Sequence, residues 1–209
     1  TPTQMLHREK ERDRLADTYL LLGRNRQGLR EWVKQCAEVL LEPTSSLADH
    51  PDFIQLDPGE IGVAGLKVEH ISQRKPEGDS LERLLRYRPA LGSRRVCGLF
   101  DVQTMQPDAQ GALLKTLEEP PEGTIFLLVA TSTSAILSPI LSRCRIIRLP
   151  EMDKSAHLQR ATTLGMNDQS FAVLYEGLRS AEAVFDLSSS ERNQLLDIHQ
   201  KFIADFHGH

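Results

Sequence analysis

The chain has 209 residues, a net charge of −4 and a pI near 6.0, with 40% hydrophobic and 26% charged residues, which suits one or two globular domains. This charge argues against a protein that coats nucleic acid electrostatically. No segment approaches the ~18 consecutive apolar residues of a membrane span. The segment Thr1–Arg14 is polar and charged, unlike an export signal, so we expect a cytoplasmic protein.

The cysteines are few and scattered. Cys36, Cys97 and Cys144 form no close pair, as is typical of a reducing compartment. No cysteine and histidine stand at the short spacing that zinc sites show. We therefore predict no structural metal.

Short apolar runs bounded by Gly, Pro or Asp predict five strands. They cover residues 18–22, 53–56, 96–100, 124–130 and 145–149. The segment 59–78 leaves both a strand and a short helix open. Helical spacing and end signals predict three helices, from Gly28 to Pro43, from Asp79 or Ser80 to about Tyr87, and from Pro107 to Leu117. Glu82 is placed for a capping box in the second of these. A short helical segment is predicted at 134–141, where Pro139 limits its regularity.

Strand and helix alternate as far as residue 149 and then the strands stop. That alternation predicts a parallel sheet with crossover helices. Beyond it the pattern is helical, at 154–164, 168–177, 180–187 and 189–206, with Gly165 and Gly177 as breaks. We predict an α/β domain over residues 1–149 and a small helical domain over residues 150–209.

A loop with the outline of a Walker A motif follows the first predicted strand. Gly23 and Gly28 form G-x4-G between a strand and a helix, which is the context that a phosphate loop needs. Leu29 stands where lysine would reach the phosphates, and Arg30 stands where Ser or Thr would ligate magnesium. The alternative is an ordinary strand-to-helix turn, whose arginines either bind an anion or are merely solvated.

The third predicted strand shows a matching loss. Asp101 stands where a Walker B strand would end, and Val102 replaces the glutamate that would activate water. Asp101 alone could orient a metal ion. Two motifs eroded together predict a site that does not hydrolyse ATP and holds no nucleotide cofactor firmly.

Three further stretches carry a family resemblance: Pro89–Val96, Ala112–Pro121 and Ser142–Cys144. The second contains Leu-Leu-Lys-Thr-Leu-Glu-Glu-Pro-Pro, which is too long a match to arise from helix propensity. Residues 18–149 resemble the AAA+ subunits of the bacterial DNA polymerase III clamp loader, and residues 150–187 do so more weakly. The likeness is strongest to the delta prime type, because gamma/tau-like chains carry an intact Walker A loop.

The resemblance implies a P-loop-type, five-stranded parallel sheet with flanking helices, followed by an all-helical lid. It implies a stator that does not hydrolyse ATP itself. In Ser142-Arg143-Cys144 it makes Arg143 an arginine finger, reaching in trans into a neighbour's ATP site. It puts Thr131 at a sensor position, with a plain polar strand end as the equal alternative. Cys144 is better explained by packing than as a nucleophile.

The chain departs from the family in three places. Residues 42–50 lack the family's four-cysteine zinc module, Glu182 replaces the arginine of the second sensor, and the chain ends at His209 before a helical collar. The last departure suggests a fragment or a variant that assembles differently. The implied partners are gamma/tau-like ATPase subunits, a delta-like subunit, the sliding clamp and, through the complex, primed DNA. Two alternatives remain: an ATP-binding gamma/tau-like ATPase, and a generic AAA+ protein-interaction module.

Overall fold

The computed structural model describes residues 2–44, 46–72, 80–149, 161–178, 184 and 187–206. The chain divides into two compact units, Thr1–Pro150 and Glu151–His209. Each unit has a hydrophobic core of its own.

The first unit is built on a five-stranded parallel sheet with strand order β2-β3-β4-β1-β5. The strands are β1 Thr18–Leu22, β2 Phe53–Leu56, β3 Arg95–Leu99, β4 Thr124–Ala130 and β5 Arg145–Arg148. The central β3 and β4 are buried throughout, which explains their continuous apolar sequences. The predicted parallel sheet is confirmed. The third strand starts one residue earlier than predicted, and the fifth ends one residue earlier.

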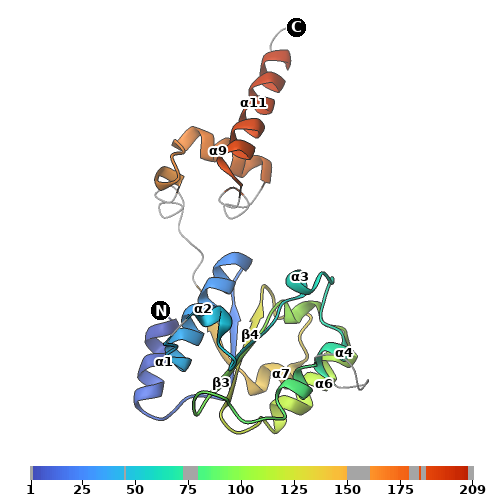
Figure 1. Ribbon diagram of the computed structural model, residues 1–209. Helices are drawn as coiled ribbons and strands as arrows, with labels where there is room; N and C mark the ends of the chain where they lie inside the picture. The colour runs from blue at the N-terminus through green and yellow to red at the C-terminus, as the bar shows by residue number, and fades with distance from the viewer. Residues whose placement is uncertain are drawn as a thin grey trace. The chain divides into compact units, whose positions relative to one another are not determined.

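Helices cover both faces of the sheet (Figure 1). Successive strand residues point to opposite faces, so Leu20 and Phe126 join one core cluster while Leu21 and Leu127 join the other. The elements of this unit outside the sheet are α1 Pro2–Glu11, α2 Arg26–Leu41, η1 Leu47–Asp49, α3 Pro58–Ile61, α4 Val68–Ile71, α5 Leu81–Leu84, η2 Val102–Thr104, α6 Pro107–Glu118 and α7 Ser138–Arg143.

Helix α1 has no counterpart among the predicted elements. Its sequence is almost wholly polar, but Leu6 is fully buried and Lys10 Nζ donates to the Val39 carbonyl of α2 at 2.8 Å. Glu9 accepts a hydrogen bond from the Tyr19 hydroxyl and pairs with Arg145 Nη1 at 2.7 Å. Tertiary contacts, which local periodicity does not show, therefore hold this helix in place.

Helix α5 is shorter than predicted. Ser80 caps it, accepting from the Arg83 N–H at 3.3 Å, so Glu82 is the second helical residue and the predicted capping box is wrong. Glu82 Oε2 instead accepts a hydrogen bond from Ser72 at 2.9 Å. The buried Arg95 guanidinium binds three carbonyls that a longer helix would have used, those of Leu84, Tyr87 and Arg88.

Three other boundaries correct the sequence prediction. Helix α2 begins at Arg26, with Asn25 as its N-cap, and not at Gly28. Helix α7 begins at Ser138, with Pro139 in its first turn, where proline fits a helix well, so Pro139 does not make it irregular. Of the ambiguous segment 59–78, the described residues 59–72 contain most of the one-turn helix α3 and all of the one-turn helix α4, and the rest lies outside the described residues.

The described part of the second unit contains α9 Asp168–Leu178, α11 Ser189–Phe206 and a helical turn at residues 161–163. Phe171 and Leu174 of α9 form its core with Ala161, Met166 and Val184, against which Leu196 packs. Gly165 ends the turn with φ +76°, whereas Gly177 lies inside α9 and is no break. Much of the helices predicted at 154–164 and 180–187 lies outside the described residues. No described helix is long and apolar enough to cross a membrane.

Candidate functional site

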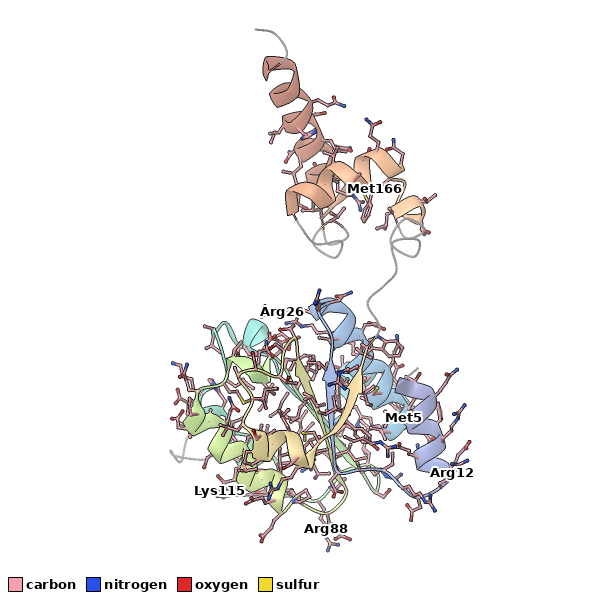
Figure 2. The ribbon with its side chains drawn as sticks, turned by 180° about the vertical axis from the view of Figure 1, so that it is seen from behind. Met5, Arg12, Arg26, Arg88, Lys115 and Met166 are labelled. Carbon is pink, nitrogen blue, oxygen red and sulfur yellow. The ribbon has the colours of Figure 1, made fainter. Side chains whose placement is uncertain are left out.

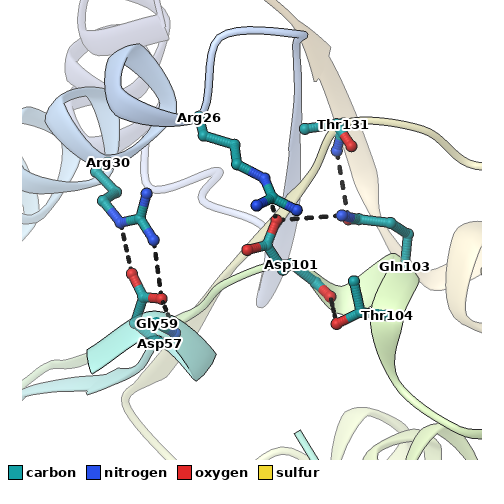
Figure 3. A network of polar contacts seen from close by, with 8 residues as sticks. All are labelled: Arg26, Arg30, Asp57, Gly59, Asp101, Gln103, Thr104 and Thr131. Atoms are coloured by element: carbon teal, nitrogen blue, oxygen red, sulfur yellow. Dashed lines mark hydrogen bonds and ion pairs between the residues drawn. The ribbon is translucent and has the colours of Figure 1, made fainter. Parts of the chain in front are cut away.

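The candidate phosphate-site residues meet at one end of the sheet. Gly23, Asp101 and Thr131 follow β1, β3 and β4, and the carboxyl ends of parallel strands share one edge. Figure 3 shows the polar network that forms there.

The loop after β1 is shorter than a G-x4-G spacing suggests. Because α2 begins at Arg26, Gly28 lies in its first turn. The Gly28 N–H donates to the Asn25 side chain at 2.7 Å, and a Cβ at Gly28 would stand 2.8 Å from Asn25 Nδ2. An N–H that a phosphate would need is therefore used by the helix's own cap. Leu29 is only 1% exposed and packs in the core.

A first arginine–aspartate pair links this loop to the end of β3. Arg26 Nε lies 3.2 Å from Asp101 Oδ1, and the Asp101 side chain is 11% exposed. Gln103 Nε2 donates to the same carboxylate at 3.1 Å, and the Thr131 N–H donates to Gln103 Oε1 at 3.3 Å (Figure 3). Asp101 itself has φ +51°, a left-handed conformation in which aspartate is enriched. Gln103 thus joins the two predicted residues, although no motif marks it.

A second pair fixes Arg30. Its Nε and Nη2 donate to the two carboxylate oxygens of Asp57 at 2.5 and 2.9 Å, and the Gly59 N–H donates to Asp57 Oδ1 at 2.9 Å (Figure 3). The guanidinium also lies over the Phe100 ring, 5.7 Å from its centroid. From the sequence, Asp57 is predicted only to follow the second strand.

These contacts set the charge of Asp57. Burial by itself raises the pKa of this carboxyl, but the hydrogen bonds from Arg30 and from the Gly59 N–H, with the Arg30 charge, outweigh burial and lower it. The pKa of Arg30 is raised, chiefly by its hydrogen bond to Asp57. Both groups are therefore charged at neutral pH and neutralise each other.

Two positions that hold a magnesium–nucleotide complex in P-loop proteins carry other residue types here. No lysine or hydroxyl stands at the two catalytic loop positions, and Asp101 already faces an arginine. Within the described parts of the chain, no group of three or more His, Cys, Asp or Glu residues has the arrangement of a metal site. Glu182, the predicted departure at the second sensor, lies outside those parts.

Arg143 lies elsewhere, at the C-terminal end of α7. Its Nη1 donates to the Pro139 carbonyl at 3.0 Å, and its Nη2 donates to Glu118 Oε1 of α6 at 2.8 Å. Its side chain is 38% exposed. On either side, Ser142 Oγ donates to the Pro139 carbonyl and Cys144 Sγ to the Ile140 carbonyl. Burial raises the pKa of the Cys144 thiol to about 12, so it is neutral at pH 7.

The finger candidate and the phosphate loop occupy opposite ends of the strands. Arg143 immediately precedes β5, whereas Gly23 immediately follows β1, and the register pairs Tyr19 with Arg145 and Leu22 with Arg148. About 10 Å of paired strand therefore separates the two ends, at ~3.3 Å per residue. In Figure 2, Arg26 of α2 and Lys115 of α6 lie at opposite ends of the first unit. The structure thus gathers all the predicted loop residues with Asp101 and Thr131, but not the Ser142–Cys144 motif.

Comparisons with known proteins agree with this fold. The sequence profile of the family described as "DNA polymerase III, delta subunit" matches residues 1–153. The delta' subunit of Yersinia pestis is 33% identical over 115 residues, which are 55% of this chain and 32% of that protein. The tau/gamma subunit of Haemophilus influenzae is 36% identical over 103 residues, which are 47% of this chain and 15% of that protein.

A solved structure extends the likeness in shape. The gamma subunit-related protein of Thermotoga maritima superposes with a TM-score of 0.61 at 20% identity, covering 80% of this chain and 55% of that one. The chain thus spans about half or less of the length of each of these relatives. The family match covers most of the chain, so this protein belongs to the DNA polymerase III delta subunit family, as a delta-prime-like member of the AAA+ clamp-loader proteins.

Proposed function

We propose that this chain acts in a DNA polymerase III clamp loader as a subunit that hydrolyses no ATP itself and lends Arg143 to a neighbouring ATPase. The observation that carries the proposal is that the loop and strand ends of the phosphate region are bonded to one another, which we call the closed phosphate region. Arg26 pairs with Asp101, Arg30 pairs with Asp57, and Leu29 is a core residue. In other P-loop proteins the charged residues of this region face phosphate and magnesium. Here they form ion pairs with each other.

The position of Arg143 supports action in trans. It lies at the end of the sheet away from the chain's own loop, and its side chain is partly exposed. A partly exposed arginine side chain can contact another subunit. A guanidinium supplied from outside a phosphate site can neutralise charge that develops on the transferred phosphoryl group, which is worth ~10³–10⁵ in rate for arginine fingers in general. Its planar fork suits two-point contact with phosphate oxygens.

A stator role follows from the same closed region. Switch elements in nucleotide-binding proteins move because phosphate and magnesium contacts order or release them. Here internal ion pairs make the corresponding contacts, so the domain has no such signal of its own. We propose gamma/tau-like ATPase subunits, a delta-like subunit and the sliding clamp as partners, and primed DNA as a partner through the complex.

The test uses the full chain reconstituted with gamma/tau-like ATPase and delta-like subunits. We expect Arg143→Ala to lower the ATPase stimulated by clamp and primed DNA at least ~10-fold, while assembly stays intact. Arg88→Ala is the matched control, because Arg88 is 90% exposed and, among the described residues, its ion pair is a loose one of 3.8 Å with exposed Glu122. Unchanged ATPase in the Arg143→Ala complex would contradict the proposal and favour a generic interaction module.

An active ATPase is the second candidate, supported by the 36% identity with a tau/gamma subunit. Equilibrium dialysis of the isolated chain with radiolabelled ATP and magnesium separates the two. We expect no saturable binding at millimolar ATP. Saturable binding that is lost on changing Gly28 to a bulky residue would instead support the gamma/tau-like alternative.

A further inference from the structure

Glu118 is a carboxylate in an unfavourable place. It is the last residue of α6, where the partial negative charge of the helix end disfavours an anion. Its partner is Arg143 of α7, with 2.8 Å between Glu118 Oε1 and Arg143 Nη2. The two side chains are 45% and 38% exposed, and an ion pair so exposed contributes only ~0.2–1 kcal/mol to stability. Stability alone therefore explains this pair poorly.

We propose that Glu118 is a positioning residue that holds the Arg143 guanidinium in the orientation a neighbour's triphosphate requires. The inference rests on the proposed function of Arg143. It joins two of the three stretches that carry the family resemblance, because Glu118 belongs to Leu-Leu-Lys-Thr-Leu-Glu-Glu-Pro-Pro and Arg143 to Ser-Arg-Cys.

The geometry fixes the plane of the guanidinium. Nη1 is tied to the Pro139 carbonyl within α7, and Nη2 is tied to Glu118 from a different helix. Two contacts on two nitrogens favour one orientation of the group over the others. Because a guanidinium has five N–H donors, others remain for phosphate oxygens. Holding it in advance removes an entropic cost that a free arginine side chain would meet on every engagement.

The carboxylate is itself on a rigid element. Leu113 and Leu117 bury the inner face of α6, and Gln110 ties the helix to the segment before α7 by donating to the Ala135 carbonyl at 2.7 Å and accepting from the Leu137 N–H at 2.8 Å. A positioning group acts well only when its own support is fixed.

The neighbouring carboxylate provides the control. Glu119 caps the same helix, is exposed, and makes no hydrogen bond or ion pair in the described part of the chain. Its removal changes the local charge by the same amount as removal of Glu118 and touches no guanidinium. Any effect specific to Glu118 therefore arises from its contact with Arg143.

The experiment measures stimulated ATPase in the reconstituted complex with Glu118→Ala, Glu118→Gln and Glu119→Ala. We expect Glu118→Ala to lower kcat roughly 3- to 30-fold with little change in the KM for ATP, because orientation acts in the transition state. Glu118→Gln keeps an oxygen acceptor and should fall between Glu118→Ala and the unaltered chain. Glu119→Ala should match the unaltered chain.

A double variant shows whether Glu118 acts through Arg143. Adding Glu118→Ala to Arg143→Ala should cause no further loss, because the group being positioned is already gone. Additive losses, a Glu118→Ala rate equal to that of Glu119→Ala, or a raised rate would overturn the inference. If Arg143→Ala lowers the rate and Glu118→Ala does not, only the inference fails. If Arg143→Ala leaves the rate unchanged, both the inference and the proposed function fail.

Discussion

The arginines at the two ends of this sheet are held in different ways. At the carboxyl end, Arg26 and Arg30 face aspartates whose side chains are 11% and 1% exposed. At the amino end, Arg143 faces a carboxylate that is 45% exposed. Burying a charge ties it to its partner, because separating the two leaves an uncompensated charge, whereas an exposed pair separates at little cost. The arginine side chains themselves do not differ in this way, since Arg26 is 58% and Arg30 35% exposed against 38% for Arg143, so the difference between the two ends lies in the burial of the carboxylate partners.

The sharpest way to break this comparison is to return the missing lysine to the loop. We expect Leu29→Lys to destabilise the first unit by about 3–5 kcal/mol, since it puts an ammonium where a side chain is 1% exposed and packed against apolar neighbours. Urea denaturation followed by circular dichroism measures the loss. The exposed Lys34→Leu is a control for composition and should change little. A Leu29→Lys chain as stable as the original would show that the loop can open.

A smaller effect is expected from removing the partner of Arg30. Asp57→Ala should cost about 1–3 kcal/mol, because it removes two hydrogen bonds from Arg30 and one from the Gly59 N–H. The 35% exposure of the Arg30 side chain limits the loss, since water reaches its guanidinium. Thermal unfolding measures it, with Glu60→Ala on the same turn as control. No shift in Tm would mean that Arg30 is as weakly held as Arg143.

The Arg30–Asp57 pair should also give the domain an acid-sensitive component. The folded-state pKa of Asp57 is lowered, so the pair contributes fully above the unfolded-state value near 3.8 and is lost as pH falls through the folded value. Urea midpoints between pH 7 and pH 2.5 should fall less steeply for Asp57→Asn than for the unaltered chain. Parallel curves would exclude Asp57 as a source of this dependence.

The smallest stability effect belongs to the amino end. Glu118→Ala should change the free energy of unfolding by no more than about 0.5 kcal/mol, because its ion pair is half exposed. The same variant is expected to lower stimulated ATPase severalfold, so activity and stability separate at this residue. Differential scanning calorimetry beside the ATPase assay tests that separation. A loss above 2 kcal/mol would make Glu118 a structural residue.

The buried strands could be predicted because parallel strands covered on both faces are continuous apolar runs, as Thr124–Ala130 is. Helix α1 could not be predicted, since a tertiary hydrogen bond from Lys10 and one buried leucine hold it in place. At the site, the eroded Walker motifs singled out Gly23 and Asp101, and the family resemblance singled out Thr131. Neither revealed that Asn25 caps Gly28, or that Asp57 and Gln103 complete the network. The Arg30–Asp57 and Thr131–Gln103 contacts join residues 27 and 28 positions apart, and no local pattern encodes such pairings. The Asn25 cap is local, and asparagine just before a helical pattern is the signal that could have found it.

The anchoring of α1 has a practical consequence for anyone handling this protein. Glu9 joins the Tyr19 hydroxyl of β1 to Arg145 of β5, the strand at the rim of the sheet. Removing the first dozen residues would leave the Tyr19 hydroxyl and Arg145 without Glu9 and destabilise the edge strand β5. The backbone of this strand and its exposed Ile146 could then pair with another molecule. Shortened versions of the chain should therefore be made from the other terminus.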